Sequence, residues 1–287
     1  HYNYVDYLRK DDLYKELIPF LYNCNVDISK IHRRLIIEKM CPEHFISQTI
    51  FYDNVINLLD KNTHITFKDL PDPTILTHFR DIVTDIHDNF HIDKIPSIHV
   101  DVLEEQYIKK NIIPELDDLF IRYENNFKVI EKTKNKFVSL LDINSQSTPI
   151  LKRDYDNEFF VTTKTRAEKF KTNVNSRYKQ NQSIKIIVPQ KKTSQINELN
   201  KTLEYKVSDF TIEKSGSKSD RRICHPVFAS IIKETVELIN LIHSYHKNFL
   251  KEKLTEYKNY IKTFRIIEEF IVNLDISCRL FVELSER

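Results

Sequence analysis

The sequence predicts a mainly α-helical protein with a helical core, a long antiparallel pair of helices and a small β-rich insertion between those two helices. Apolar residues recur at helical spacing over residues 1–90, and two long heptad-like patterns begin at Pro114 and at Pro226. The stretch between the two patterns is rich in β-branched and aromatic residues instead. We therefore expect a helical core over 1–113, an outgoing helix over 114–149, the insertion over 150–222, and a returning helix with further core over 223–287.

The N-terminal region carries the pattern of consecutive helices. Asp27 can accept a hydrogen bond from the first turn of a helix, and that helix should end before Pro42 because the residue preceding a proline is pushed out of the α region. Pro42 in turn suits the first turn of the next helix. After a loop, apolar residues from Ile75 to Phe90 predict a further helix.

The first heptad pattern starts at Pro114 and alternates spacings of four and three residues. About 30 residues at 1.5 Å each make a rod of roughly 45 Å. Such a pattern is typical of a long helix packed against a partner helix. Its expected seam consists of Leu116, Phe120, Tyr123, Phe127, Ile130, Lys134, Phe137 and Leu141.

The second heptad pattern follows Pro226 and continues, after a shift of one residue between Phe249 and Leu250, as far as Phe281. No proline or glycine interrupts it, so about 55 residues are expected to form one helix of roughly 80 Å, bent at the shift. Two long helices separated by an insertion pack most simply as an antiparallel pair with the insertion at the tip.

The insertion combines expected short strands with a concentration of positive charge. The strands are expected at Glu158–Thr163, Ile184–Val188 and Leu203–Val207. Residues 159–195 hold seven lysines and two arginines but only one acid, Glu168, which gives this segment a net charge of +8. The whole chain carries only +2, so the remainder is acidic overall.

Such local charge favours contact with the phosphates of a nucleic acid, because lysine and arginine displace condensed counterions. Aromatic residues interleave with the charges and could stack on bases, although aromatics in short strands more often form local core. Nothing in the segment has the pattern of a base-reading helix, so binding is expected to be independent of sequence. A solvated lysine-rich loop is the competing interpretation. The candidate DNA-binding residues are Lys164, Arg166, Lys169, Lys171, Arg177, Lys179, Lys185, Lys191 and Lys192.

Several kinds of chemistry are excluded or disfavoured by the sequence. A Walker A loop, a dinucleotide fingerprint and a nucleophile elbow each need at least two nearby glycines, and this chain has one, Gly216. No catalytic nucleophile–base pair and no metal-ligand set stands out, so we expect no enzyme activity and no cofactor in this chain. His243 and His246 share a helix face, but no second pair completes a metal site, and we interpret them as surface histidines.

The cellular setting is inferred from equally simple observations. No apolar run approaches the length of a membrane span. The four cysteines are scattered and indicate reduced thiols, hence an intracellular protein. Whether this is the nucleus, the cytoplasm or a viral factory stays open. Residue 1 is histidine and the only methionine is Met40, so we expect the chain to be part of a longer protein.

Four stretches, in order, resemble the middle region of MutS-type DNA mismatch repair proteins. Asp27–Leu35, followed by a proline, is similar to the family's D-(I/L)-E-(R/K)-(L/I)-x-R-(R/K) helix. Pro114–Leu119 resembles the opening of the family's lever, with Asn111 and Ile112 where Gly-Tyr is usual. Glu158–Arg166 is similar to the strand that enters the clamp, and Phe270–Phe281 to the close of the returning lever helix.

The resemblance implies a mechanism for the longer protein. A homo- or heterodimer of MutS-like subunits would close around double-stranded DNA, the clamp would touch the phosphate backbone, and the lever would relay that contact to an ATPase that uses ATP and Mg²⁺ outside this chain. The abundance of Ile, Lys, Asn and Tyr suits an AT-rich genome such as that of a large DNA virus. The alternative is a coiled-coil scaffold whose basic loop binds RNA or acidic proteins.

Overall fold

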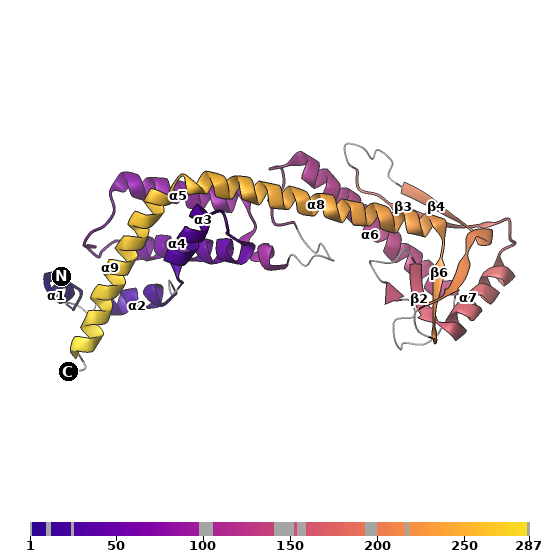
Figure 1. Cartoon of the computed structure of the whole chain (residues 1–287), viewed down its shortest axis with the longest axis horizontal. Coiled ribbons are helices and arrows are strands. Elements are labelled where there is room, and N and C mark those ends of the chain that lie inside the picture. Colours follow the sequence, from indigo (N-terminus) through magenta and orange to yellow (C-terminus); the bar gives the residue numbers. More distant parts are fainter. Residues whose placement is uncertain are drawn as a thin grey trace. The chain divides into compact units, whose positions relative to one another are not determined.

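The computed structural model is mainly helical and carries a small antiparallel sheet (Figure 1). It describes residues 2–9, 13–23, 26–97, 106–140, 152–153, 159–192, 200–215 and 218–285. The chain divides into two compact units: unit 1 comprises 1–112 and 246–287, and unit 2 comprises 113–245. Among the described helices, none combines the length and the apolar character needed to cross a bilayer.

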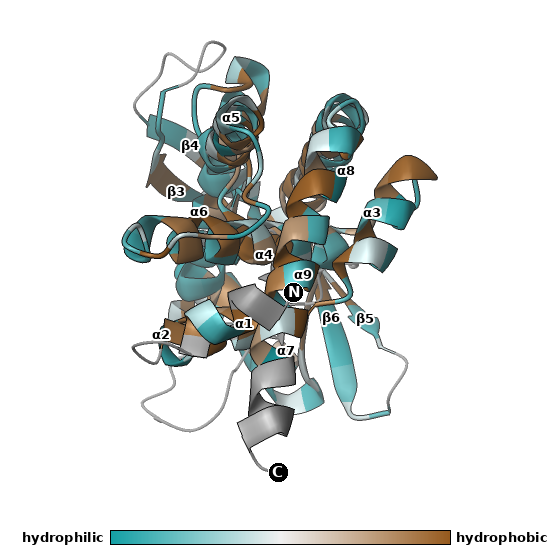
Figure 2. Ribbon diagram, turned by 90° about the vertical axis from the view of Figure 1, so that its left-hand side faces the viewer, coloured by the Kyte–Doolittle hydropathy of each residue, from teal (hydrophilic) through white to brown (hydrophobic). Residues whose placement is uncertain are grey.

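Unit 1 contains the helices expected near the N-terminus. The carboxylate of Asp27 accepts a hydrogen bond from the Lys30 N–H at 3.0 Å, and Asp72 accepts one from the Thr74 N–H at 2.8 Å, so both act as N-caps. Figure 2 shows the polar and apolar faces of the helix that Asp27 caps. The elements are α1 (Tyr2–Arg9), α2 (Leu13–Asn23), α3 (Ile28–Ile36), α4 (Pro42–Lys61), α5 (Pro73–Asn89) and the 3₁₀ helix η2 (Ile92–Ser97).

The second long pattern forms two helices, α8 (Pro226–Lys258) and α9 (Ile261–Ser285), so the prediction of one continuous helix was wrong. The break lies at Asn259–Tyr260, not at the phase shift, which falls inside α8. There the backbone changes to short-range bonds, from the Asn259 N–H to the Glu256 carbonyl and from the Tyr260 N–H to the Tyr257 carbonyl, both at 3.0 Å. No proline or glycine marks this turn.

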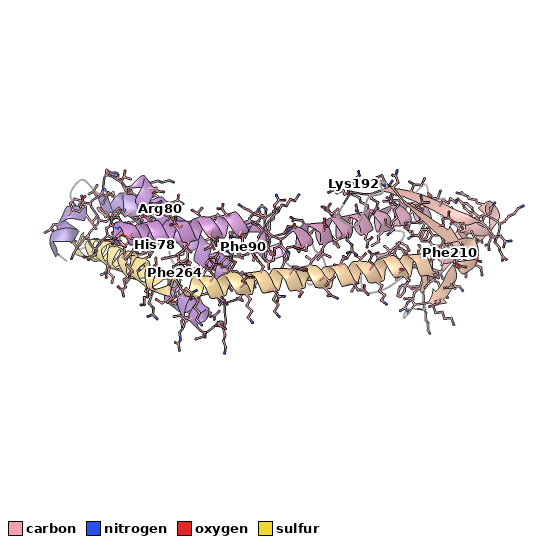
Figure 3. The ribbon with its side chains drawn as sticks, turned by 90° about the horizontal axis from the view of Figure 1, so that it is seen from above. His78, Arg80, Phe90, Lys192, Phe210 and Phe264 are labelled. Carbon is pink, nitrogen blue, oxygen red and sulfur yellow. The ribbon has the colours of Figure 1, made fainter. Side chains whose placement is uncertain are left out.

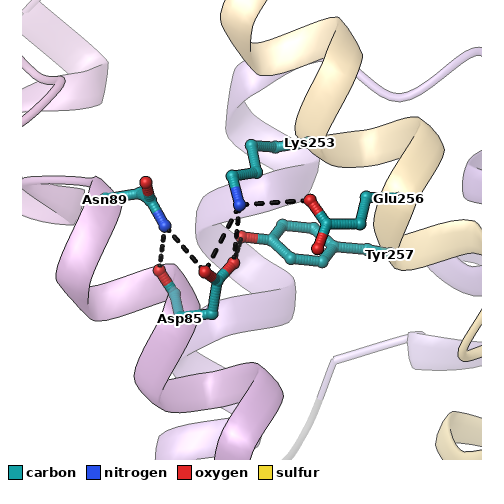
Figure 4. A network of polar contacts seen from close by, with 5 residues as sticks. All are labelled: Asp85, Asn89, Lys253, Glu256 and Tyr257. Atoms are coloured by element: carbon teal, nitrogen blue, oxygen red, sulfur yellow. Dashed lines mark hydrogen bonds and ion pairs between the residues drawn. The ribbon is translucent and has the colours of Figure 1, made fainter. Parts of the chain in front are cut away.

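A polar network anchors α8 to α5 just before the break (Figure 4). The carboxylate of Asp85 accepts hydrogen bonds from Tyr257 Oη at 2.8 Å and from Lys253 Nζ at 3.1 Å. It also accepts one from Asn89 Nδ2 at 2.9 Å. The hydrogen bonds to Asp85 raise the pKa of Lys253, as does its contact with Glu256, although burial acts in the opposite sense. Asp85 therefore gives the end of α8 a fixed partner.

Aromatic rings fill the core of unit 1. Tyr52 lies 4.9 Å from Phe264 and 5.1 Å from Phe79 between ring centroids, and its side chain is fully buried. His246 was expected at the surface, but it is only 2% exposed and its ring lies 4.1 Å from that of Tyr107. That expectation was wrong because the sequence of a helix does not show which other segment will pack against each of its faces.

Unit 2 is built on the first heptad helix, α6 (Pro114–Leu140), together with the first part of α8. Its strands form a four-stranded antiparallel sheet in the order β1-β2-β6-β5 and a separate hairpin, β3-β4. The strands are β1 (Lys152–Arg153), β2 (Phe159–Thr163), β3 (Ser183–Pro189), β4 (Asn200–Lys206), β5 (Thr211–Lys214) and β6 (Asp220–Cys224), with a 3₁₀ turn η3 (Val207–Asp209) after β4. The three strands expected from sequence correspond to β2, β3 and β4.

The insertion also contains a helix that the sequence pattern did not predict, α7 (Lys164–Arg177). It buries only Ala167, Phe170 and Val174 and is otherwise polar. Those three apolar positions do recur at helical spacing, but the surrounding lysines and threonines weaken the pattern. The expected border between 149 and 150 lies outside the described residues.

Seven of the eight expected positions of the α6 seam are described, and four of these seven are buried. Leu116, Tyr123, Ile130 and Phe137 are buried, as predicted, whereas Phe120 and Phe127 are only half-buried. The second row of buried residues lies one position earlier and contains Asn126, Thr133 and Leu140. Thr133 is buried because its hydroxyl hydrogen-bonds to Tyr205 Oη at 2.9 Å, a partner that the sequence alone does not reveal. Leu141, the last expected seam residue, lies outside the described residues.

One aromatic cluster links the elements of unit 2. The ring of Phe137 on α6 lies 5.4 Å, centroid to centroid, from each of four other rings. All four pairs are edge-to-face, an arrangement that aromatic rings favour. We call this group the Phe137 cluster; its other members are Phe160 on β2, Phe170 on α7, Tyr205 on β4, and Phe210, which is labelled in Figure 3.

Replacing the ring of Phe137 should strongly destabilise unit 2. Phe137→Ala is expected to lower the free energy of unfolding by about 3–5 kcal/mol, because a fully buried phenyl is lost and a cavity remains. Urea denaturation followed by circular dichroism would measure this. Phe127→Ala on the same helix is the matched control and should cost clearly less, since Phe127 is half-buried. Equal costs would contradict the observed seam.

The stability of unit 1 should depend on the proton state of His32. This ring is 2% exposed; its Nδ1 hydrogen-bonds to Glu268 at 2.8 Å and its Nε2 to Tyr52 Oη at 2.9 Å. Burial lowers the pKa of His32 below 6.5, and Glu268 opposes this only in part. The unfolded chain therefore binds the proton more readily, so the stabilisation is complete above about pH 6.5 and is lost as the pH falls through the lower folded-state pKa.

Comparison of wild type with His32→Gln isolates this contribution. Urea unfolding at about pH 7.5 and about pH 5.5 should show a larger loss of stability for the wild type than for the variant. The other histidines are present in both proteins and cancel in the comparison. The same loss in both proteins would contradict the assignment.

Candidate nucleic-acid interface

Five of the nine predicted DNA-binding residues lie on α7. Its buried face packs on β2, β6 and α6 (Figure 1), which directs the remaining side chains away from the core. Lys164, Lys169, Lys171 and Arg177 are exposed, and Arg166 is half-buried. The helix carries a single acid, Glu168. α7 therefore presents a basic surface whose backbone is fixed by the core beneath it.

Polar contacts hold both ends of this helix. The Lys164 N–H donates to the Ser219 carbonyl at 2.8 Å, which joins the first turn of α7 to the residues before β6. Asn173 Nδ2 donates to the carbonyl of Leu140, the last residue of α6, at 2.7 Å. The first turn has no acidic residue and no side-chain cap, so its positive end is not neutralised locally.

The other four predicted residues flank β3. Lys179 precedes the strand, Lys185 lies on its exposed face, and Lys191 and Lys192 follow it; Figure 3 labels Lys192. Asn125 of α6 holds this segment through two hydrogen bonds to the backbone of Lys191. Its Nδ2 donates to the Lys191 carbonyl at 2.9 Å, and its Oδ1 accepts from the Lys191 N–H at 2.8 Å.

Among the contacts recorded between described residues, three of the predicted lysines are paired with a carboxylate. Lys185 Nζ lies 2.9 Å from Glu204, Lys164 Nζ lies 3.9 Å from Glu168, and Lys191 Nζ contacts Glu124. All of these side chains are about half or more exposed, and such pairs typically contribute only about 0–1 kcal/mol. A phosphate can therefore replace the carboxylate at little cost.

Four predicted lysines have no carboxylate partner within the described ranges: Lys169, Lys171, Lys179 and Lys192. All four are exposed, so their charge is available to an external anion without breaking an ion pair. They are distributed between α7 and the segment around β3. The predicted residues thus form two groups. The helix group consists of the five on α7, namely Lys164, Arg166, Lys169, Lys171 and Arg177, and the hairpin group consists of Lys179, Lys185, Lys191 and Lys192.

The interleaved aromatics have mainly structural roles. Phe160 belongs to the Phe137 cluster and is fully buried, and Tyr178 packs against the same core. Phe159 is half-buried, and the guanidinium of Arg222 lies 4.2 Å from the centre of its ring. Arg222 and its neighbour Arg221 are half-buried on β6 and, as adjacent residues of a strand, point to opposite faces of the sheet; both stand outside 159–195 and were not among the predicted residues. The only signal in sequence is the Arg-Arg pair itself.

Other polar sites offer no comparable alternative. A hollow of about 660 Å³ in unit 1 is lined by Ser29, Arg33, Arg265, Glu268 and His32, but both ring nitrogens of His32 are already hydrogen-bonded. A second, of about 320 Å³, borders the Asp85 network. Within the described ranges, no three His, Cys, Asp or Glu side chains gather as metal ligands would.

Comparison with known proteins adds no family to this description. No protein-family model matches the chain, and no curated protein matches its sequence. Function is therefore inferred from the geometry and charge of unit 2.

The Asn125 contact with Lys191 should be important for the hairpin group. Asn125→Ala removes two hydrogen bonds from a side chain that is 1% exposed, and we expect a loss of about 1–3 kcal/mol in the free energy of unfolding. The Lys191 amide should also exchange its hydrogen faster. Asn175→Ala, at an exposed position on α7, is the control and should stay within about 0.5 kcal/mol of wild type. Unchanged exchange at Lys191 would contradict this role.

Proposed function

We propose that unit 2 binds double-stranded DNA through its phosphates, without strong sequence preference, and that α7 is the centre of the contact. The observation that carries the proposal is a helix with five basic residues and one acid, anchored by its apolar face to a rigid aromatic core. A fixed arrangement of cations loses less conformational entropy on binding than a flexible lysine-rich loop would.

The charge of this surface supports a polyanion as the partner. Each lysine or arginine that contacts a phosphate releases condensed counterions, and the resulting affinity depends steeply on salt. The exposed lysines without carboxylate partners supply the first contacts. Lys164, Lys185 and Lys191 can exchange their exposed carboxylate partners for phosphates.

The wider proposal follows the resemblance to MutS-type proteins. In it, α6 and α8 act as the lever and the insertion as the clamp of one subunit in a homo- or heterodimer. Contact with DNA would be relayed to an ATPase elsewhere in the longer protein, and ATP and Mg²⁺ would bind there. What supports this part is the order of the four sequence stretches and the continuity of α8 through residues of both units.

The salt dependence of binding tests the first part. If about five phosphates are contacted, the logarithm of the association constant for a mixed-sequence duplex should fall with the logarithm of salt concentration at a slope near −4.5. Replacing Lys164, Arg166, Lys169 and Lys171 together by glutamine should flatten that slope and weaken binding. Fluorescence anisotropy between about 50 and 200 mM NaCl would measure both.

A charge-matched control is available in unit 1. Replacing the exposed residues Lys39, Lys68, Lys247 and Lys262 by glutamine removes the same charge and should leave the slope nearly unchanged. Equal effects of the two quadruple variants would contradict a localised interface. Tighter binding of RNA or of an acidic protein than of duplex DNA would favour the scaffold alternative.

A further inference from the structure

We infer that α7 inserts into the major groove of the duplex, so that its exposed ridge faces the base edges and its two flanks face the two phosphate strands. This inference rests on the proposed function and adds the mode of binding. It depends on how residue types are distributed around the helix, which is an observation separate from the total charge.

The ridge opposite the buried face is made mostly of short uncharged side chains. Thr165, Lys169, Thr172 and Ser176 are spaced by four, three and four residues, so they follow one another along one face, and all four are exposed. Short side chains allow the helix backbone to approach the floor of a groove, whereas long ones would hold it away.

Two of the ridge hydroxyls are oriented by the helix itself. Thr172 Oγ1 donates to the Glu168 carbonyl at 3.0 Å, and Ser176 Oγ donates to the Asn173 carbonyl at 3.0 Å. Each hydroxyl uses its hydrogen in this way, so its oxygen is left to accept a further hydrogen bond. Hydroxyl oxygens and the single ammonium group of Lys169 can meet base edges of more than one kind, so these contacts add little sequence preference to the phosphate contacts.

The basic residues lie to both sides of this ridge. Lys164 and Lys171 are seven residues apart on one side, with about 10 Å between them along the axis. Arg166 and Arg177 are eleven residues apart on the other side, about 16 Å along the axis. Glu168 lies on the side of Lys164 and pairs with it, so Lys171 is expected to be the stronger phosphate ligand there.

This two-sided arrangement distinguishes groove insertion from docking along one strand. A helix lying on a single phosphate strand would place its cations in one stripe along the exposed ridge. Here the ridge holds one cation, and the flanks hold the rest. A major groove about 12 Å wide admits a helix about 10–12 Å across, with a phosphate strand on each side.

A steric variant tests the inference independently of charge. Thr172→Tyr places a bulky side chain on the ridge and should weaken duplex binding about tenfold or more, without changing the net charge. Thr77→Tyr, at an exposed position on helix α5 of unit 1 where the hydroxyl also donates to a carbonyl four residues earlier, is the matched control and should change affinity less than about twofold. Circular dichroism would verify that both variants fold.

Methylation of guanine N7, which lies in the major groove, supplies the second readout. Wild-type protein should protect N7 from dimethyl sulfate, and the minor-groove ligand netropsin should not displace it. Duplex binding without N7 protection, together with no effect of Thr172→Tyr, would overturn groove insertion and leave phosphate binding standing. Absence of duplex binding by the wild type would overturn the proposed function and this inference together.

Discussion

The packing of four aromatic rings around Phe137 is the interaction on which unit 2 depends. Because the four rings come from β2, α7, β4 and the residue that follows η3, the buried side chain of Phe137 joins the heptad helix α6 to the sheet, the hairpin and the basic helix. Each ring buries a large apolar area, and the edge-to-face pairs add a directional preference. The orientation of α7, and with it the display of its cations, follows from Phe170 occupying its place in this cluster.

Hydrogen bonds add to the packing of the aromatic core by holding the hairpin and α7 in place. The side-chain amide of Asn125 and the carbonyl of Leu140 attach the hairpin and α7 to the same helix. The positions of both groups of cations are therefore fixed relative to α6. Unit 1 uses the same principle, since Asp85 and His32 join helices through buried or half-buried hydrogen bonds. In both units the cost of removing these polar atoms from water is offset because they have hydrogen-bond partners in the protein.

The elements were predictable where one physical signal dominated. Asp27 and Pro42 marked the starts of α3 and α4, apolar spacing marked α5, and β-branched runs marked β2, β3 and β4. α7 was missed because only three of its residues are apolar and buried. The second row of the α6 seam was predicted one residue too late because Asn126 and Thr133 are polar. The break at Asn259–Tyr260 had no signal in the sequence, because neither proline nor glycine stands there; in the structure, Asp85 of α5 holds Tyr257 in the turn that precedes it.

The sequence by itself determined that the chain is mainly helical, that a β-containing insertion interrupts two long helical patterns, and that positive charge is concentrated in residues 159–195. These properties are local: they depend on spacing, capping and composition. Only the tertiary structure decided that five of the cations share one helix and that Lys164, Lys185 and Lys191 are paired with carboxylates. The tertiary structure also decided which side chains of α7 form the exposed ridge, mostly short hydroxyls, and which form the basic flanks. The reason is that exposure and pairing are set by contacts between residues far apart in the chain.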